Sequence, residues 1–220
     1  GHSNLTDRVL EAFRNGPEAR IVVMIHDTIP LDYPQYQTPQ SVTRFKGMLR
    51  RVRGFADLVI YNSDQTRRDA ERHMAKWGTP PEGIVALLGI ELPLPDVAQI
   101  PEGVMPDGPY FVTLGTIEPR KNHAFLLDLW DSWDNPPHLV ICGNRGWKNE
   151  EVFARLDAAK DSGAPITELN GLSDAQLMGL LRGAKAALFP SLAEGFGLPQ
   201  IEALSLGVPV ICGDLDIYRE

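Results

Sequence analysis

The sequence predicts an α/β protein whose parallel β-sheets are covered by helices. Beyond residue 110, short apolar segments typical of buried strands alternate with segments of helical periodicity. Two further strand-like segments occur in the first half, and a proline-rich stretch separates the two halves. A chain of 220 residues with 43% hydrophobic and 23% charged side chains is long enough to bury a sizeable core in one large or two small domains.

The second half shows the regular alternation of a Rossmann-type domain, in which a parallel sheet carries helices on both faces. The predicted strands are Tyr110–Leu114, His138–Cys142, Ile166–Leu169, Ala186–Phe189 and Val208–Cys212. The predicted helices are Ala124–Trp130, Glu150–Ala159, Asp174–Arg182 and a last one that begins near Pro199.

The first half contains fewer predicted elements. The predicted strands are Ile21–Ile25 and Leu58–Tyr61, and the predicted helices are Arg8–Phe13, Ser41–Ala56 and Gln65–Met74. Residues 92–109 hold five prolines and show almost no periodicity, which is typical of a linker between domains. The predicted organisation is therefore a domain over residues 1–91, a linker over 92–109 and a domain over 110–220.

Charge is divided unevenly between the halves. Residues 1–91 carry a net charge of +1, and residues 92–220 carry a net charge of −9. Such an acidic half argues against a nucleic-acid partner. No apolar stretch approaches the roughly 18–20 residues of a membrane-spanning helix, and the polar amino terminus does not look like a signal peptide. We therefore expect a cytoplasmic protein.

The run from Glu194 to Glu202 is the most informative stretch for chemistry. It follows the predicted strand at 186–189, and Gly195 and Gly197 allow a tight turn before the next helix. Glu194 should thus lie on a loop at the carboxyl end of a strand, and Glu202 one turn into the helix. Ligands of α/β sheets bind at this edge, where helix N-termini attract phosphate. Two carboxylates there suggest recognition of hydroxyl groups, although Glu194 as a helix cap and Glu202 as a solvated residue remain the alternative.

A second motif follows the predicted strand at 110–114. Gly115 ends the strand, and Arg120 and Lys121 stand side by side just before a predicted helix. Arginine grips two phosphate oxygens at once and lysine acts as a mobile point charge, so this pair suits a diphosphate. A solvated surface pair is the alternative.

Together these motifs resemble the group 1 glycosyltransferases, a family of retaining enzymes with the GT-B fold. The likeness covers about residues 110–214 and lies in a Glu-x7-Glu run, a Gly-x4-Arg-Lys-Asn run and glycines at strand ends. The residues that carry it are Gly115, Arg120, Lys121, Asn122, Gly143, Gly171, Glu194 and Glu202. The resemblance implies a GT-B-like fold with two Rossmann-type parallel-sheet domains. It also implies transfer of a sugar, with retention, from a nucleotide diphosphate sugar to a hydroxyl group of a glycan, lipid-linked or small-molecule acceptor.

The resemblance also implies roles for individual residues. Arg120 and Lys121 would neutralise the departing diphosphate, Glu202 would hold the ribose hydroxyls, and Glu194 would orient the sugar. The other implied donor-site residues are Gly115, Gly143, Gly195, Phe196, Gly197 and Leu198. Family members need no cofactor and no obligatory metal, and this sequence has no His/Cys cluster. Asp214-Leu-Asp216 has the spelling of a metal-binding Asp-x-Asp motif, but we expect it to be a loop.

Two residues of the first half extend the likeness more weakly. His26 opens a His-Asp-x-x-Pro element at the end of a predicted strand, an element that faces the interdomain cleft in some family members. We count His26 among the catalytic candidates, with a hydrogen-bonded structural histidine as the alternative. Ser63 resembles a strand-end serine of the family, and it equally suits the N-cap of the helix that follows.

The predicted helix at 41–56 has arginine and lysine crowded around an apolar stripe. Such a basic amphipathic helix can lie on an anionic membrane surface, and peripheral contact with the inner membrane surface would suit a lipid-linked acceptor. A solvated face is the alternative.

Compared with full-length members of the family, the chain looks truncated at both ends. We expect the amino-terminal domain to be incomplete and the carboxyl-terminal domain to lack its last helices. A non-catalytic nucleotide-sugar-binding fragment is therefore one alternative function. A nucleotide-sugar epimerase or a phosphorylase of the same fold is another.

Overall fold

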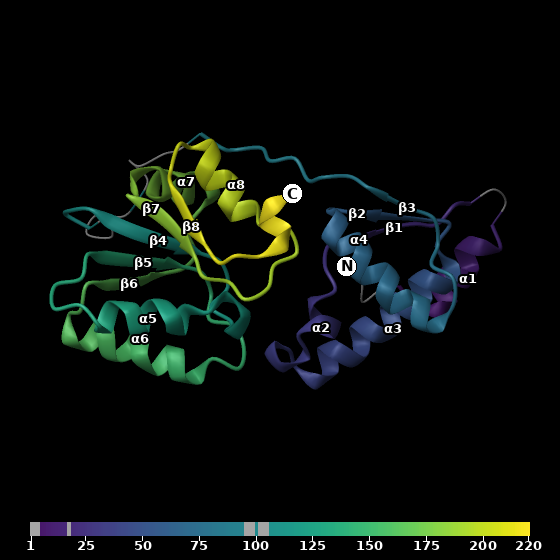
Figure 1. Cartoon of the computed structure of the whole chain (residues 1–220), viewed down its shortest axis with the longest axis horizontal. Coiled ribbons are helices and arrows are strands. Elements are labelled where there is room, and N and C mark those ends of the chain that lie inside the picture. Colours follow the sequence, from purple (N-terminus) through teal and green to yellow (C-terminus); the bar gives the residue numbers. More distant parts are fainter. Residues whose placement is uncertain (1–4, 17–18, 95–99, 101–105) are drawn as a thin grey trace. The chain divides into compact units, whose positions relative to one another are not determined.

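The computed structural model describes residues 5–16, 19–94, 100 and 106–220. The chain forms two compact units. Unit 1 consists of Gly1–Gly89, Ala193–Phe196 and Leu215–Glu220, and unit 2 of Ile90–Leu192 and Gly197–Asp214. The predicted linker at 92–109 falls partly outside the described residues, at 95–99 and 101–105. Figure 1 shows both units, coloured along the sequence.

Unit 2 contains a five-stranded sheet in which every neighbouring pair of strands is parallel. The strands are β4 (Tyr110–Leu114), β5 (His138–Cys142), β6 (Ile166–Leu169), β7 (Ala186–Phe189) and β8 (Val210–Cys212). Their order across the sheet is β6-β5-β4-β7-β8. The strand order therefore reverses between β4 and β7, as in a Rossmann fold.

Helices cover both faces of this sheet. They are α5 (His123–Asp131), α6 (Glu150–Ser162), α7 (Asp174–Gly183) and α8 (Leu198–Ser205), with a short 3₁₀ helix, η4 (Pro119–Lys121), before α5. In Figure 1, α5 and α6 lie on one side of the sheet and α7 and α8 on the other. Ser173 begins α7 with a capping box, because its side chain and that of Gln176 bond each other's backbone N–H groups.

Two apolar clusters bind these helices to the sheet. Because successive strand residues point to opposite faces, Val112 joins the cluster with α7 and α8, and Phe111 packs against the cluster with α5 and α6. The buried Tyr110 hydroxyl donates to the carbonyl of Leu180 in α7 at 2.6 Å. The short β7, fully buried over its length, thus forms the middle of a two-faced core.

Unit 1 contains a three-stranded parallel sheet of order β1-β2-β3. The strands are β1 (Val22–Ile25), β2 (Leu58–Tyr61) and β3 (Gly83–Val85). The helices are α1 (Asp7–Arg14), α2 (Ile29–Asp32), α3 (Pro39–Phe55) and α4 (Asp64–Met74), with 3₁₀ turns η2 (Pro34–Tyr36), η3 (Ala75–Trp77) and η5 (Asp216–Arg219). The core lies between one face of the sheet and the apolar sides of α3 and α4, where Met48, Leu49 and Met74 are buried.

No helix among the described residues is both long enough and apolar enough to cross a membrane.

Gly143, directly after β5, provides a test of the packing at the strand ends. A β-carbon there would stand 1.9 Å from the carbonyl oxygen of Gly115, and backbone cannot move aside as a flexible side chain can. We expect Gly143→Ala to lower the free energy of unfolding by about 1–3 kcal/mol in denaturant titrations. The control is Gly89→Ala, where an added methyl group meets no atom within 4 Å. Equal stability of the two variants would contradict the close approach.

Candidate functional site

The candidate site of unit 2 lies at the carboxyl ends of β4 and β7. These strands are neighbours, with Phe111 opposite Ala186 and Val112 opposite Ala187. They also flank the point where the strand order reverses, and ligands of open α/β sheets bind in the crevice outside the strand ends at such a point. The loop after β4 carries Arg120 and Lys121, and the helix after β7 carries Glu202.

Two hydrogen bonds join the loops that follow these strands. The backbone N–H of Leu192 donates to the carbonyl of Arg120 at 2.8 Å. The side chain of Asn122 donates from Nδ2 to the carbonyl of Pro190 at 3.2 Å. Asn122 also has a left-handed backbone conformation (φ 57°) between η4 and α5. The cations of the first loop are thereby held beside the second loop.

Arg120 is positioned by a carboxylate that the sequence analysis did not single out. Its Nη2 lies 2.8 Å from Oε1 of Glu118, whose side chain is only 3% exposed, whereas that of Arg120 is 18% exposed. A buried carboxylate behind a partly exposed guanidinium fixes the direction of the cation and leaves part of it accessible. The sequence signal that could have identified Glu118 is its closeness to Arg120, with only Pro119 between them.

Gly115 and Gly143 directly follow β4 and β5, at the same edge of the sheet. Gly115 has φ 125°, a region that side-chain-bearing residues rarely adopt. A β-carbon at Gly115 would lie 3.4 Å from Cε of Lys121, so the lysine side chain runs close over this glycine. The structure therefore gives both glycines a packing role, and their contact with a ligand stays a prediction.

Glu202 lies in the second turn of α8, and it is half-buried. Within the part of the chain that the structure describes, no hydrogen bond or ion pair engages its carboxylate. Burial, together with the nearby charge of Asp174, raises the pKa of Glu202 above its ordinary value. A half-buried carboxylate without a donor of its own is a suitable acceptor for the hydroxyl groups of a ligand. Gly197, with φ 99°, is the N-cap of α8, and Leu198 is the first residue of the helix.

The remaining predicted site residues belong to unit 1. Glu194, Gly195 and Phe196 form a half-buried loop, and His26 is an exposed residue at the carboxyl end of β1. A β-carbon at Gly195 would stand 2.7 Å from the carbonyl oxygen of His26. Within unit 1, the structure therefore brings the segment after Glu194 into close contact with the histidine loop.

Two polar residues that the sequence analysis did not assign hold this contact together. Asn62 donates from Nδ2 to the carbonyls of His26 at 2.8 Å and Gly195 at 3.2 Å. The hydroxyl of Thr66 donates to the same two carbonyls at 3.3 and 3.4 Å. Asn62 directly follows β2, and Thr66 lies in the first turn of α4. Ser63 acts as the N-cap of that helix, since its Oγ accepts from the N–H of Thr66 at 3.0 Å.

The described residues contain no group of three or more His, Cys, Asp or Glu side chains arranged to hold a metal ion. Asp214 and Leu215 lie in a loop as expected, and Asp216 begins η5.

His123, directly after the Arg120-Lys121-Asn122 run, is a buried histidine at the first position of α5. It is 2% exposed, and neither ring nitrogen has a hydrogen-bond partner among the described residues. Burial and the neighbouring charge of Lys121 lower the pKa of His123 to about 4. The imidazole is therefore neutral near pH 7, and Arg120 and Lys121 are the cations of this loop.

Comparison with known proteins places these features in context. Residues 99–220 match the family model described as "Glycosyl transferases group 1". The serotype-specific mannosyltransferase WbdA of Escherichia coli is 31% identical over 214 residues, which is 90% of this chain and 26% of that protein. The O-antigen chain mannosyltransferase B of Escherichia coli is 28% identical over 214 residues, which is 91% of this chain and 55% of that protein. The chain thus spans only about a quarter of the length of WbdA.

Solved structures show the same fold at low sequence identity. The Anabaena HepE protein in complex with UDP-glucose superposes with a TM-score of 0.69 and 20% identity, over 100% of this chain and 59% of that chain. A sucrose-phosphate synthase from Thermosynechococcus elongatus superposes with a TM-score of 0.67 and 19% identity, over 94% of this chain and 53% of that chain.

The burial of His123 predicts a specific pH dependence. The unfolded chain binds a proton at this residue below about pH 6.5, and the folded chain only below about pH 4. Folding stability should therefore fall as the pH decreases through this window, by about 3 kcal/mol from this group. In urea titrations between pH 7 and pH 4, His123→Leu should show a shallower loss of stability than the unchanged protein. Parallel curves would contradict a neutral, buried His123.

Proposed function

Since the chain belongs to the group 1 glycosyltransferases, we propose that it binds a nucleotide diphosphate sugar and transfers the sugar to an acceptor hydroxyl group. The observation that carries the proposal is the pairing of β4 with β7 at the reversal of strand order. At that edge the loop after β4 carries two adjacent cations, and the helix after β7 carries a half-buried carboxylate. A nucleoside diphosphate requires both features, because its phosphates need positive charge and its ribose needs a hydroxyl acceptor.

In this proposal, Arg120 and Lys121 stabilise the negative charge that grows on the departing diphosphate. Glu118 holds the guanidinium in place before the substrate arrives, so little reorganisation is needed during the reaction. The neutral ring of His123 adds no third charge that would repel these cations. Catalysis by this loop is electrostatic and positional.

The carboxylates have separate roles in the proposal. Glu202 accepts hydrogen bonds from the ribose hydroxyls. Glu194, with backbone N–H groups around Phe196 and Leu198, orients the transferred sugar, and His26 acts on the acceptor side. The bonds from Asn62 support this division, because they fix the loop of Glu194 against the loop of His26. Retention at the anomeric carbon, without a cofactor or an obligatory metal, is proposed from the family resemblance.

The names of the relatives support a more specific substrate class. Both Escherichia coli relatives are named mannosyltransferases, and one is named for the O-antigen chain. We therefore propose mannose as the transferred sugar and a growing glycan as the acceptor.

Peripheral contact with a membrane is a further part of the proposal. Helix α3 carries five arginine and lysine residues and no carboxylate. No ion pair involves any of these five cations in the described part of the chain, and Arg44, Lys46 and Arg50 are exposed. Each such residue near an anionic lipid surface contributes about 1 kcal/mol of binding. A lipid-linked glycan at the inner membrane surface would match this helix.

The phosphate-binding role of Arg120 and Lys121 is testable by calorimetry. Replacing both by alanine should weaken binding of a nucleoside diphosphate by about 1.5–3 kcal/mol for each cation lost. Arg120→Lys should recover only part of the affinity, because lysine lacks the two-pronged geometry. Arg182→Ala with Lys185→Ala is the matched control, since these exposed cations lie at the opposite end of β7. Unchanged affinity in the first double variant would refute the assignment.

The two glutamates should differ in what they bind. Glu202→Gln removes the anionic acceptor at constant size, so it should weaken binding of the free nucleoside diphosphate. Glu194→Gln should leave that affinity intact and reduce the additional affinity, or the turnover, that the sugar provides. The measurement is a pair of titrations, with nucleoside diphosphate and with nucleotide sugar. Equal losses with free nucleotide would contradict the division of roles.

A further inference from the structure

The segment after His26 presents two aromatic rings that the donor site does not use. Tyr33 follows α2 and Tyr36 ends η2, and the planes of their rings are nearly parallel (15°), with centroids 6.1 Å apart. Tyr33 is 38% exposed, and Tyr36 is half-buried. Neither ring belongs to the apolar core of unit 1. The pair therefore contributes an aromatic surface at the rim of the unit.

The two tyrosines lie in the segment that follows the carboxyl end of β1 in the unit 1 sheet. The chain leaves the carboxyl end of β1 at His26 and reaches Tyr33 through the short helix α2. The N–H of Ile29 donates to Oδ1 of Asp27 at 3.0 Å, and the N–H of Tyr33 donates to the carbonyl of Ile29 at 2.9 Å. The backbone N–H of Tyr36 likewise donates to the carbonyl of Tyr33 at 3.1 Å. Backbone hydrogen bonds thus order the segment that carries both rings.

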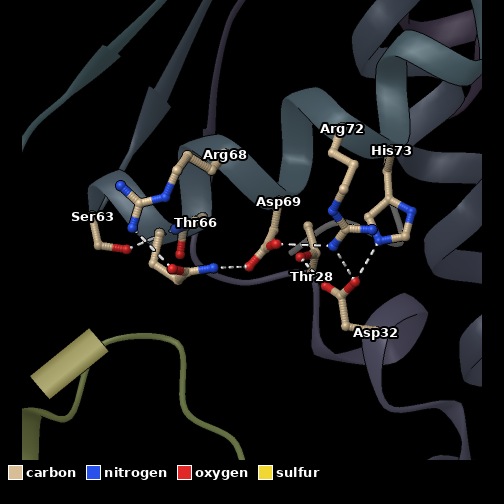
Figure 2. Close-up of polar contacts among 9 residues, drawn as sticks. Thr28, Asp32, Ser63, Thr66, Arg68, Asp69, Arg72 and His73 are labelled. Atoms are coloured by element: carbon tan, nitrogen blue, oxygen red, sulfur yellow. Dashed lines mark hydrogen bonds and ion pairs between the residues drawn. The ribbon is translucent and has the colours of Figure 1, made fainter. Parts of the chain in front are cut away.

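A carboxylate network, centred on Asp32, anchors the segment to α4 (Figure 2). His73 Nε2 and Arg72 Nη2 lie 2.7 and 2.6 Å from Oδ1 of Asp32. The hydroxyl of Thr28 donates to Oδ2 at 2.5 Å. Arg72 also pairs with Asp69 at 2.8 Å, so the cation itself is fixed. Desolvation opposes ionisation of Asp32, but the hydrogen bonds from Thr28, Arg72 and His73 hold its pKa below the ordinary value.

The carboxylate and the imidazole of this network are largely buried. The Asp32 side chain is 16% exposed and that of His73 8%, and desolvating such polar groups costs free energy that their mutual bonds largely offset. The result is a surface segment held in one conformation, directly before an exposed tyrosine. Rigid aromatic side chains on a fixed backbone bind ligands with little loss of conformational entropy.

We propose that Tyr33 and Tyr36 form a platform for a sugar ring of the acceptor glycan, and that Asp32 and His73 are positioning residues for it. A sugar ring has an apolar face of C–H groups, which packs on the negative face of an aromatic ring, while its hydroxyl rim stays in water. His26, the candidate residue on the acceptor side, precedes Tyr33 in the same segment after β1, so we assign the platform to the acceptor. This inference rests on the proposed glycosyl transfer and adds a subsite to it.

The test uses the 220-residue chain and α-linked mannotriose, a neutral saccharide that no charged patch attracts. Affinity is measured by calorimetry, and contact with the tyrosine rings by saturation-transfer NMR. Tyr33→Ala should raise the dissociation constant about three- to tenfold, and Tyr33→Phe should restore it, since the ring is retained. Phe13→Ala is the matched control, because Phe13 is an exposed aromatic residue (60%) on α1 of the same unit.

The anchoring role needs a readout that a purely structural role would not change. Asp32→Asn and His73→Gln should each weaken mannotriose binding in the folded protein, and adding His73→Gln to Tyr33→Ala should bring no further loss. Lower melting temperatures with unchanged saccharide affinity would overturn the positioning role. If one anchor variant does not fold, the other supplies the measurement.

Nucleoside diphosphate binding, followed as a shift in melting temperature, separates this inference from the proposed function. Retained nucleotide binding without saccharide binding, or with equal saccharide affinity in Tyr33→Ala, overturns the platform and leaves the proposed function standing. Saccharide binding that depends on Tyr33, in a chain that binds no nucleoside diphosphate, supports the platform and contradicts the proposed donor site.

Discussion

The candidate donor site depends on the pairing of β4 with β7. These strands are far apart in the sequence, and a Rossmann-type strand order makes them neighbours. Because both are parallel, their carboxyl ends meet at one edge, and the loops that follow are joined through the carbonyls of Arg120 and Pro190. If β7 paired at another place in the sheet, the loop that leads to α8 and Glu202 would not be joined to the loop of the cations. The chemistry proposed for unit 2 is thus a consequence of strand order.

Unit 1 is organised around α4 in a comparable way. Asn62, just before the helix, and Thr66, in its first turn, donate to the carbonyls of His26 and Gly195, and near the end of the helix His73 binds Asp32. One helix therefore holds the loop after β1 at two places. Hydrogen bonds of this kind favour one arrangement, because breaking one would leave a desolvated donor or acceptor without compensation.

Sequence reasoning succeeded where local signals are strong. The α/β class, the group 1 glycosyltransferase family and the GT-B-like fold are confirmed. The strands Leu58–Tyr61 and Tyr110–Leu114 were predicted with the observed bounds, since each is an apolar run closed by a polar residue or glycine. The strand β3 and the helix α2 were not predicted, because both are short and follow or contain proline. The last strand begins at Val210 rather than Val208, since Pro209 has no N–H to donate to the sheet.

The sequence by itself determined most of the strands and helices, the N-cap Ser63, and the chemical character of the Arg120-Lys121 pair. These features depend on hydrogen bonds and periodicity within a few residues. Only the tertiary structure decided that the loops of Arg120 and Pro190 are joined, and that the segment after Glu194 packs in unit 1 against the histidine loop. Such partners are chosen by packing between segments distant in the chain, and no local pattern of residues encodes which carbonyl or carboxylate will be near.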